Sequence, residues 1–289
     1  MVSIGTPLVV EGDMSRRIDS IDSVQALLSK LRERGPSLPF RELKESIEDL
    51  AITLLNETKV TRPPVALSNL AYESGIRSVI LADTEVDGLL FSQEGGGFQV
   101  ILNSHHNSVR RRFSLAHEVM HALLASPGTQ LRDTSDHSFN AGHTELVCNM
   151  FAAAILMPQP FLAAFLEGRP SWKLVKDISS RFQVSIEAAV RRLVSLTPHP
   201  VILVKWSVDP LLEDRFRFES ALYSSSCRAR VSNSDINAWP IVLRTLNTGK
   251  NVLDVDIVPL SGASGPVTVE TRVTGASQLR SVFALISQQ

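Results

Sequence analysis

Residues 112–124 read RFSLAHEVMHALL, and within them His117, Glu118 and His121 form the pattern His-Glu-x-x-His. The stretch is largely apolar and contains no glycine or proline, which predicts a helix. Because residues four apart lie on one helix face, the imidazoles of His117 and His121 can reach the same metal ion. Glu118 lies one step round the helix and can contact a water on that ion without being a ligand. The alternative is an ordinary helix with a solvated glutamate, and the helical setting of the full pattern argues against it.

A second stretch, residues 145–158, reads ELVCNMFAAAILMP and can supply the third protein ligand that a zinc hydrolase needs. Its alanines and its closing Pro158 predict a helix. Glu145 is expected in the first turn, where the helix macrodipole stabilises a carboxylate. Asn149 lies one turn further on the same face, where it either orients a ligand or simply packs. If the two helices pack side by side, Glu145 completes a His-His-Glu site.

Other residues near these stretches compete for roles at the site. His137 and His143, in the connecting segment, are alternative third ligands. Cys148 lies near Glu145 and is a further candidate ligand, but a buried packing thiol is favoured because its helix is rich in alanine. Metal-dependent peptidases usually add a donor for the tetrahedral oxyanion. The sequence leaves five candidates for that donor open, namely His105, His106, His137, His143 and Tyr72.

The two stretches resemble the ImmA/IrrE family of bacterial metallopeptidases, and within it the IrrE branch. The resemblance rests on FSLAHExxHALL and ExxCNxxAAxxLMP, and it extends over about Ala82 to Pro158. Residues 100–104 are also similar to the strand that the family places before its active-site helix. The resemblance implies a zincin-like domain with Glu118 as the catalytic residue and a metal on His117, His121 and Glu145. His-His-carboxylate ligation suits Zn²⁺, and Mn²⁺ or Fe²⁺ can substitute in such sites.

Composition indicates a folded protein without a bulk attraction for nucleic acid or membranes. The chain has 289 residues, of which 44% are hydrophobic and 20% charged, so a packed core is expected. The net charge of −1 gives no global electrostatic case for a polyanionic partner. Two cysteines do not make a disulfide framework. The N-terminus does not resemble a signal peptide and no stretch is long enough to span a bilayer, so we expect a cytoplasmic protein.

The pattern of elements predicts an α+β chain in four parts. Residues 1–37 are an arm with one helix, and residues 38–158 are the zincin-like metallopeptidase domain. Residues 159–198 are a helical module that resembles helix-turn-helix. Residues 199–289 are a C-terminal α+β domain, which the resemblance implies to be GAF-like and sensory. In its last part Leu279, Val282, Phe283 and Ile286 have the spacing of a closing amphipathic helix.

The resemblance also implies a substrate. Proteases of this family cleave a helix-turn-helix transcriptional repressor and release the genes that it silences. The expected activity is therefore that of an endopeptidase acting on a cognate repressor in response to stress or another signal. Residues 1–37 are too short for such a repressor domain, so the substrate is expected to be a separate protein. The strand at Val100–Asn103 is expected to pair with the extended substrate by strand addition.

Two other functions compete with this interpretation. One is a DNA-binding transcription regulator that uses residues 159–198 and keeps a structural metal site. Direct nucleic-acid binding is not expected, because Arg191 and Arg192 without a broad basic stripe make a weak footprint. The intact Glu118 also argues against it, since a structural site does not need a base. The other is a broad housekeeping protease, for which the sequence offers no processive or membrane element.

Overall fold

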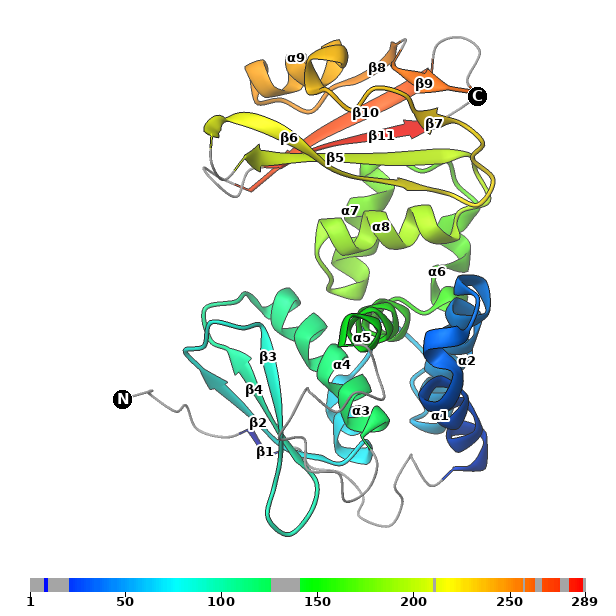
Figure 1. The fold of residues 1–289 in the computed structure, drawn as a ribbon, viewed down its shortest axis with the longest axis vertical. Helices are drawn as coiled ribbons and strands as arrows, with labels where there is room; N and C mark the ends of the chain where they lie inside the picture. The colour runs from blue at the N-terminus through cyan, green and yellow to red at the C-terminus, as the bar shows by residue number, and fades with distance from the viewer. Residues whose placement is uncertain are drawn as a thin grey trace. The chain divides into compact units, whose positions relative to one another are not determined.

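The computed structural model describes residues 8–9, 21–125, 141–209, 212–256, 258–262, 267–275 and 281–287. The chain divides into two compact units, each of which combines helices with a sheet (Figure 1). The first unit contains Met1–Phe161 and Arg181–Ser185, and the second contains Leu162–Ser180 and Ile186–Gln289. The α+β class is therefore confirmed, while the four-part division at residues 37, 158 and 198 stays a prediction.

The sheet of the first unit has four strands in the order β1-β2-β4-β3. Their bounds are β1 (Leu8–Val9), β2 (Ile76–Ala82), β3 (Gly88–Ser92) and β4 (Phe98–Asn103). Strands β2 and β4 are parallel, and β3 pairs with β4 as an antiparallel hairpin. Gly95, Gly96 and Gly97 all have positive φ in the hairpin turn, a conformation that glycine adopts without strain. The strand expected at residues 100–104 is thus confirmed as part of this sheet.

Five α-helices and a short 3-10 helix (Gly35–Ser37) accompany this sheet among the described residues of the first unit. The α-helices are α1 (Asp22–Arg34), α2 (Phe40–Glu57), α3 (Leu67–Glu73), α4 (Ser108–Leu124) and α5 (Ala141–Leu156). Helix α4 carries the His-Glu-x-x-His pattern and packs between the β3–β4 hairpin and α5 (Figure 1). The apolar face of α2, with Ile47, Leu50 and Leu54 almost completely buried, supports α5 from behind. The site helices therefore have packed neighbours on both sides.

Both ends of α4 have partners for their unpaired backbone groups. At the start, the side chain of Asn107 accepts a hydrogen bond from the backbone N–H of Arg110. At the end, the guanidinium of Arg32 on α1 donates to the carbonyl oxygens of Leu123 and Leu124. A cation at a helix C-terminus also complements the macrodipole. These contacts fix the helix that presents the two histidines.

The second unit is built on a five-stranded antiparallel sheet in the order β6-β5-β11-β10-β8. Its strands are β5 (Val201–Asp209), β6 (Leu212–Tyr223), β8 (Leu253–Asp256), β10 (Val267–Thr274) and β11 (Ser281–Ser287). A small ribbon of β7 (Arg230–Val231) and β9 (Leu260–Ser261) accompanies it. On one face, Trp206 and Trp239 meet edge to face at 5.1 Å between ring centroids, in a core shared with α9 (Pro240–Thr248). This core explains the apolar alternation along β5 and β10.

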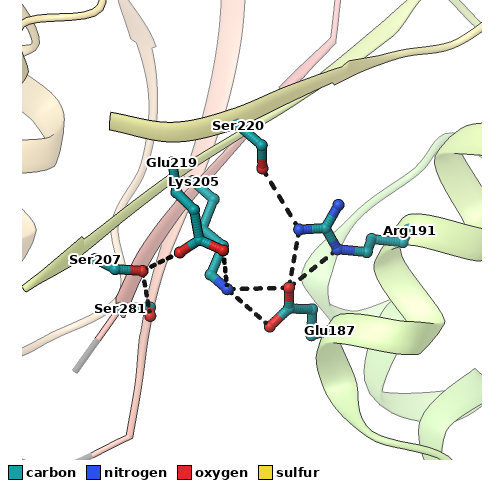
Figure 2. A network of polar contacts seen from close by, with 7 residues as sticks. All are labelled: Glu187, Arg191, Lys205, Ser207, Glu219, Ser220 and Ser281. Carbon is teal, nitrogen blue, oxygen red and sulfur yellow. Dashed lines mark hydrogen bonds and ion pairs between the residues drawn. The ribbon is translucent and has the colours of Figure 1, made fainter. Parts of the chain in front are cut away.

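Helices α7 (Trp172–Phe182) and α8 (Ile186–Leu196) cover the other face of this sheet, and α6 (Gln159–Leu166) precedes them in the chain. The indole N–H of Trp172 donates to the carbonyl oxygen of Glu270 on β10. Glu187 of α8 pairs with Lys205 of β5 at 3.1 Å, and Lys205 also contacts Glu219 of β6 at 2.8 Å (Figure 2). The helical segment read from the sequence is confirmed as helices, and its helix-turn-helix likeness stays a prediction.

The predicted closing helix near the C-terminus is wrong. Residues Ser281–Ser287 form strand β11, which pairs with β10 on one side and β5 on the other. All of its residues are buried, because helices or core cover both faces of a central strand. A short apolar run that is buried on both faces has no alternation, so its periodicity resembles that of a helix.

No single helix in the described residues is long and apolar enough to cross a membrane. By length and composition alone, residues Gly142–Leu156 and Gln159–Leu166 pass the same test together as a pair bent by 67°.

Candidate metal centre

The two histidines of α4 point their ring nitrogens at one place. His117 Nε2 and His121 Nε2 are 3.0 Å apart, and their ring centroids are 4.8 Å apart. In a tetrahedral zinc site with bonds of about 2.0–2.1 Å, nitrogen ligands stand roughly 3.3 Å from one another. The spacing of four residues on a helix therefore brings the imidazoles to the separation that a shared ion requires.

Glu145 faces both imidazoles from the second helix. Its Oε2 lies 3.2 Å from His117 Nε2, and its Oε1 lies 3.2 Å from His121 Nε2. Helix α5 begins at Ala141, so Glu145 lies about one turn inside the helix and not in the first turn as expected. Its side chain is 55% exposed, which leaves the outer side of the cluster open to solvent. Two nitrogens and a carboxylate at these distances fit a divalent ion such as zinc.

Asn149 holds the first of the two imidazoles. The Nδ1–H of His117 donates to the Asn149 side-chain oxygen over 3.1 Å. A hydrogen bond at one ring nitrogen fixes the tautomer and leaves the other nitrogen free to bind a metal. Glu145 and Asn149 are four residues apart on α5, so the same helix face supplies a donor group and the residue that orients a histidine.

Glu118 is buried beside this cluster. It is only 6% exposed, and burial, together with the negative charge of Glu145, raises the pKa of its carboxyl group to about 7. A carboxyl group with a pKa near neutrality can both accept and return a proton. An ideal Cβ built on Gly88 of β3 would stand 2.7 Å from Glu118 Oε1, so only glycine fits there without a shift. Gly88 on strand β3 is therefore packed directly against the carboxyl group of Glu118.

The charge state of His121 suits metal binding. Burial lowers its pKa, the neighbouring His117 lowers it further, and Glu145 works in the opposite direction. The net effect favours the neutral imidazole, which is the form that binds a metal.

Cys148, for which the sequence favours a packing role over metal binding, is a further donor at the site. It is buried as expected, but the ligand atoms of His117, His121 and Cys148 all lie within 4.8 Å of one another. Burial, then the charges of Glu145 and Glu118, raise the pKa of the Cys148 thiol well above its usual range. The signal was present in the sequence, because Cys148 is three residues from Glu145 and shares its helix face.

Three of the other candidates for site roles contact residues outside this cluster. His105 contacts Asp83 at 3.1 Å, and His106 contacts Asp87 at 3.6 Å. The buried ring of Tyr72 lies under the guanidinium of Arg77. His143 lies in the first turn of α5, and His137 lies outside the described residues.

The expectation that the strand at Val100–Asn103 pairs with the substrate is wrong. Strand β4, which contains Val100–Asn103, is paired on both sides, with β2 and with β3. A strand that is paired on both sides cannot add another. In the described part of the chain, β3 pairs only with β4, so β3 is the edge of the sheet nearest α4. The sequence order of the strands could not reveal which of them is the edge.

A buried glutamate between two histidines of one helix, facing a carboxylate on a second helix, is the arrangement of a metallopeptidase, a class of metal-dependent hydrolases. Comparison with known proteins agrees with this class. Residues 71–194 match the family model of the IrrE N-terminal-like domain, a peptidase family. Residues 71–194 are therefore similar to a metallopeptidase domain of the IrrE type, and the chain resembles the IrrE proteins over this part of its length.

Two relatives are radiation response metalloproteases IrrE. The chain is 38% identical to that of Deinococcus radiodurans and 34% identical to that of Deinococcus deserti, each over 108 residues. The matched segment is 36% of this chain, and it covers only 33% and 38% of the two relatives. A solved structure of a Mycobacterium tuberculosis transcriptional regulator has a similar fold, with a TM-score of 0.52 at 14% identity. That match covers 93% of this chain and 81% of the other, and it concerns the fold alone.

Proposed function

We propose that this protein is a zinc-dependent endopeptidase, with His117, His121 and Glu145 as metal ligands and Glu118 as the catalytic base. The observation that carries the proposal is the convergence of one carboxylate on two imidazoles, with a second, buried carboxylate beside them. A purely structural metal site would use the two imidazoles and the carboxylate of Glu145, and it would not need the buried carboxylate of Glu118. Mn²⁺ or Fe²⁺ can replace Zn²⁺ in such a donor set.

The residues divide the chemistry between them. Zinc, when bound, polarises the scissile carbonyl and lowers the pKa of a water molecule. Glu118 accepts the proton of the attacking water and then donates it to the nitrogen of the leaving amine. Its burial supports both steps, because a pKa of about 7 allows the carboxyl group to exist in either form near neutral pH. Asn149 keeps His117 in the tautomer that binds metal through Nε2.

The edge strand β3 is the proposed docking site for the substrate backbone. An extended peptide can add to an open sheet edge through main-chain hydrogen bonds. Gly88, at the start of this strand, lies against Glu118, so a peptide on β3 would pass close to the base. Leu89 and Phe91 of β3 are 38% and 45% exposed and offer apolar contacts. This arrangement supports cleavage of an extended segment over cleavage within a folded helix.

The proposed substrate is a helix-turn-helix transcriptional repressor, cut in response to stress. The support comes from the family of the peptidase domain and from relatives that are named for the radiation response. We also propose that the protein acts in the cytoplasm, where such a repressor would be met. The five-stranded sheet of the second unit, with helices on one face and a core on the other, supports a GAF-like sensory role for the C-terminal region.

The side chains of Arg191 and Arg192 give little support to the alternative function, that of a DNA-binding regulator. Arg191 is paired with Glu187 at 2.9 Å and reaches Ser220, while Arg192 is only 6% exposed (Figure 2). Neither arginine presents a free cation for a phosphate, and two such contacts would bind DNA weakly at physiological salt in any case.

One experiment separates the two functions. The wild type, Glu118→Gln and the matched surface control Glu85→Gln are incubated with a helix-turn-helix repressor encoded beside this gene and with its operator DNA. Repressor integrity and gel mobility are read from the same samples. We expect the wild type and Glu85→Gln to cut the repressor and Glu118→Gln to leave it intact. An intact repressor in every sample, with DNA shifted by all three proteins in a salt-sensitive manner, would favour the regulator.

A further inference from the structure

Cys148 belongs to the face of α5 that is turned toward the two histidines. It follows Glu145 by three residues and precedes Asn149, and both of these contact the imidazoles of α4. Its sulfur and the ring nitrogens of His117 and His121 all lie within 4.8 Å of one another. The sulfur is fully buried, whereas Glu145 is on the exposed side of the cluster. Two helices thus bring four donor groups to one point.

We infer that Cys148 is a fourth metal ligand, which closes the centre at rest and leaves when substrate and water need its position. The inference rests on the proposed function, because it assumes a metal on His117, His121 and Glu145. It assigns regulation to the same centre: four protein ligands make a closed site, while three ligands and an open position make a reactive one. The sulfur therefore decides between an inactive and an active state.

The distances allow both states. With Zn–N bonds of about 2.0–2.1 Å and a Zn–S bond of about 2.3 Å, sulfur and nitrogen ligands of a tetrahedral site stand roughly 3.6 Å apart. The sulfur and the two ring nitrogens lie within 4.8 Å of one another, so the sulfur–nitrogen separations exceed the tetrahedral value by at most about 1.2 Å.

Among the described residues, no hydrogen-bond partner holds the Cys148 sulfur away from the metal position. The thiol of Cys148 makes no hydrogen bond to any described residue and has no contact with solvent. When the sulfur–metal bond forms, the thiol proton is released, as it is for metal-binding cysteines in general, and reaches solvent on the side of the cluster where Glu145 is exposed. When the sulfur leaves, it takes up a proton again, and the position becomes open for a water molecule.

Cobalt substitution tests the inference, because the absorption of Co²⁺ reports its ligands. The full chain loaded with one equivalent of Co²⁺ should show the visible d–d bands of a four-coordinate site and a near-ultraviolet sulfur-to-cobalt charge-transfer band. Cys148→Ala should lose the charge-transfer band and keep the d–d bands. Cys227→Ala is the matched control, since Cys227 is also buried but lies in the core of the second unit, and it should keep both.

A second measurement needs no variant and so does not depend on whether Cys148→Ala folds. X-ray absorption by the zinc-loaded wild type should show one sulfur among the ligands. A small peptide hydroxamate, which binds the metal through two oxygens, should then remove the charge-transfer band from the cobalt protein while the d–d bands shift.

The outcomes are distinguishable. Visible d–d bands without a charge-transfer band, and zinc without a sulfur neighbour, would overturn the role of Cys148 and leave the proposed peptidase intact. A charge-transfer band that persists with hydroxamate bound would show that the sulfur does not give way, which overturns the resting state. Cobalt binding that is absent, or unchanged in a His117→Ala, His121→Ala variant, would contradict the metal centre itself.

Discussion

Gly88 on the edge strand and Glu118 on the active-site helix are so close that a methyl group at position 88 would collide with the carboxyl oxygen. The contact is 2.7 Å from an ideal Cβ to Glu118 Oε1, and Gly88 itself has no unusual φ that would require glycine. The need for glycine is therefore steric and specific to one partner. This relationship ties the position of the proposed base to the strand that is proposed to hold the substrate.

Gly88→Ala should move Glu118 and lower activity without removing the metal. A misplacement of about 1 Å near reacting atoms can cost on the order of 100-fold in rate, so we expect kcat to fall by about 10- to 100-fold. The added methyl group should also destabilise the fold by about 1–3 kcal/mol through overpacking. Urea unfolding of Gly88→Ala in the wild-type and Glu118→Ala backgrounds checks the cause. An equal loss of stability in both backgrounds would show that Glu118 is not the partner.

Purified protein should contain about one divalent ion per chain, most of it zinc, because two imidazoles and a carboxylate suit that metal. Elemental analysis of protein prepared without chelators measures this. The double variant His117→Ala, His121→Ala should lose the metal. Unchanged metal content in that variant would mean that the ion is bound elsewhere.

Glu145→Gln should weaken metal binding by at least about 10-fold, because a neutral amide is a poorer ligand for a dication than a carboxylate. Competition with a chromogenic chelator gives the affinity. The control is His143→Ala, two residues before Glu145 on the same helix, and this variant should retain the metal. If only His143→Ala lost it, the third ligand would have to be reassigned to His143.

Glu118→Gln should separate chemistry from binding. The amide keeps the shape of the side chain but cannot act as a base, so peptidase activity should fall by at least ~100-fold, the scale of a lost general base. Metal content and melting temperature should stay near those of the wild type. Normal cleavage by this variant would refute the mechanism, and loss of its metal would identify Glu118 as a ligand.

The charged network of the second unit should make stability depend on pH in the acid range. Burial raises the pKa of Glu219, but hydrogen bonds from Lys205 and Ser207 outweigh burial and hold that pKa below its ordinary value. Such a carboxyl group stabilises the fold above about pH 4.3, the ordinary pKa of glutamate, and the contribution disappears as pH falls through the lowered pKa. The difference in unfolding free energy between wild type and Lys205→Met should therefore shrink below about pH 4. The exposed Lys173→Met is the control, and a difference that does not change with pH would contradict the assignment.

Local patterns were enough to predict most of the helices and to propose the candidate site residues. His117 and His121 are spaced by a helical turn, and the apolar face of α2 repeats at helical spacing, so both are properties of one segment. Glu145 could be proposed because its helix also carries a recognisable pattern. Its position one turn inside α5 differs from the expected first turn, since the start of the helix depends on residues before the pattern.

The features that could not be predicted all depend on which segments meet in space. Strand β11 resembled a helix because both of its faces are buried, and burial on both faces is decided by the whole sheet. Strand β4 was expected to be open because its own sequence does not reveal that β2 pairs with it on the side opposite β3. The closeness of Gly88 to Glu118 likewise joins residues from two elements that have no common pattern.

The hydrogen bonds of Arg32 to the end of α4 indicate how far the peptidase domain extends as a folding unit. Its guanidinium satisfies the last carbonyl groups of the active-site helix from a distance of about ninety residues along the chain. The family match begins only at residue 71 and so leaves out α1 and α2. A fragment trimmed to the matched residues would expose the end of α4 and the apolar back of α5. The helix that precedes the matched region is therefore a part of the catalytic scaffold, and mutations in it can impair a centre that they never touch.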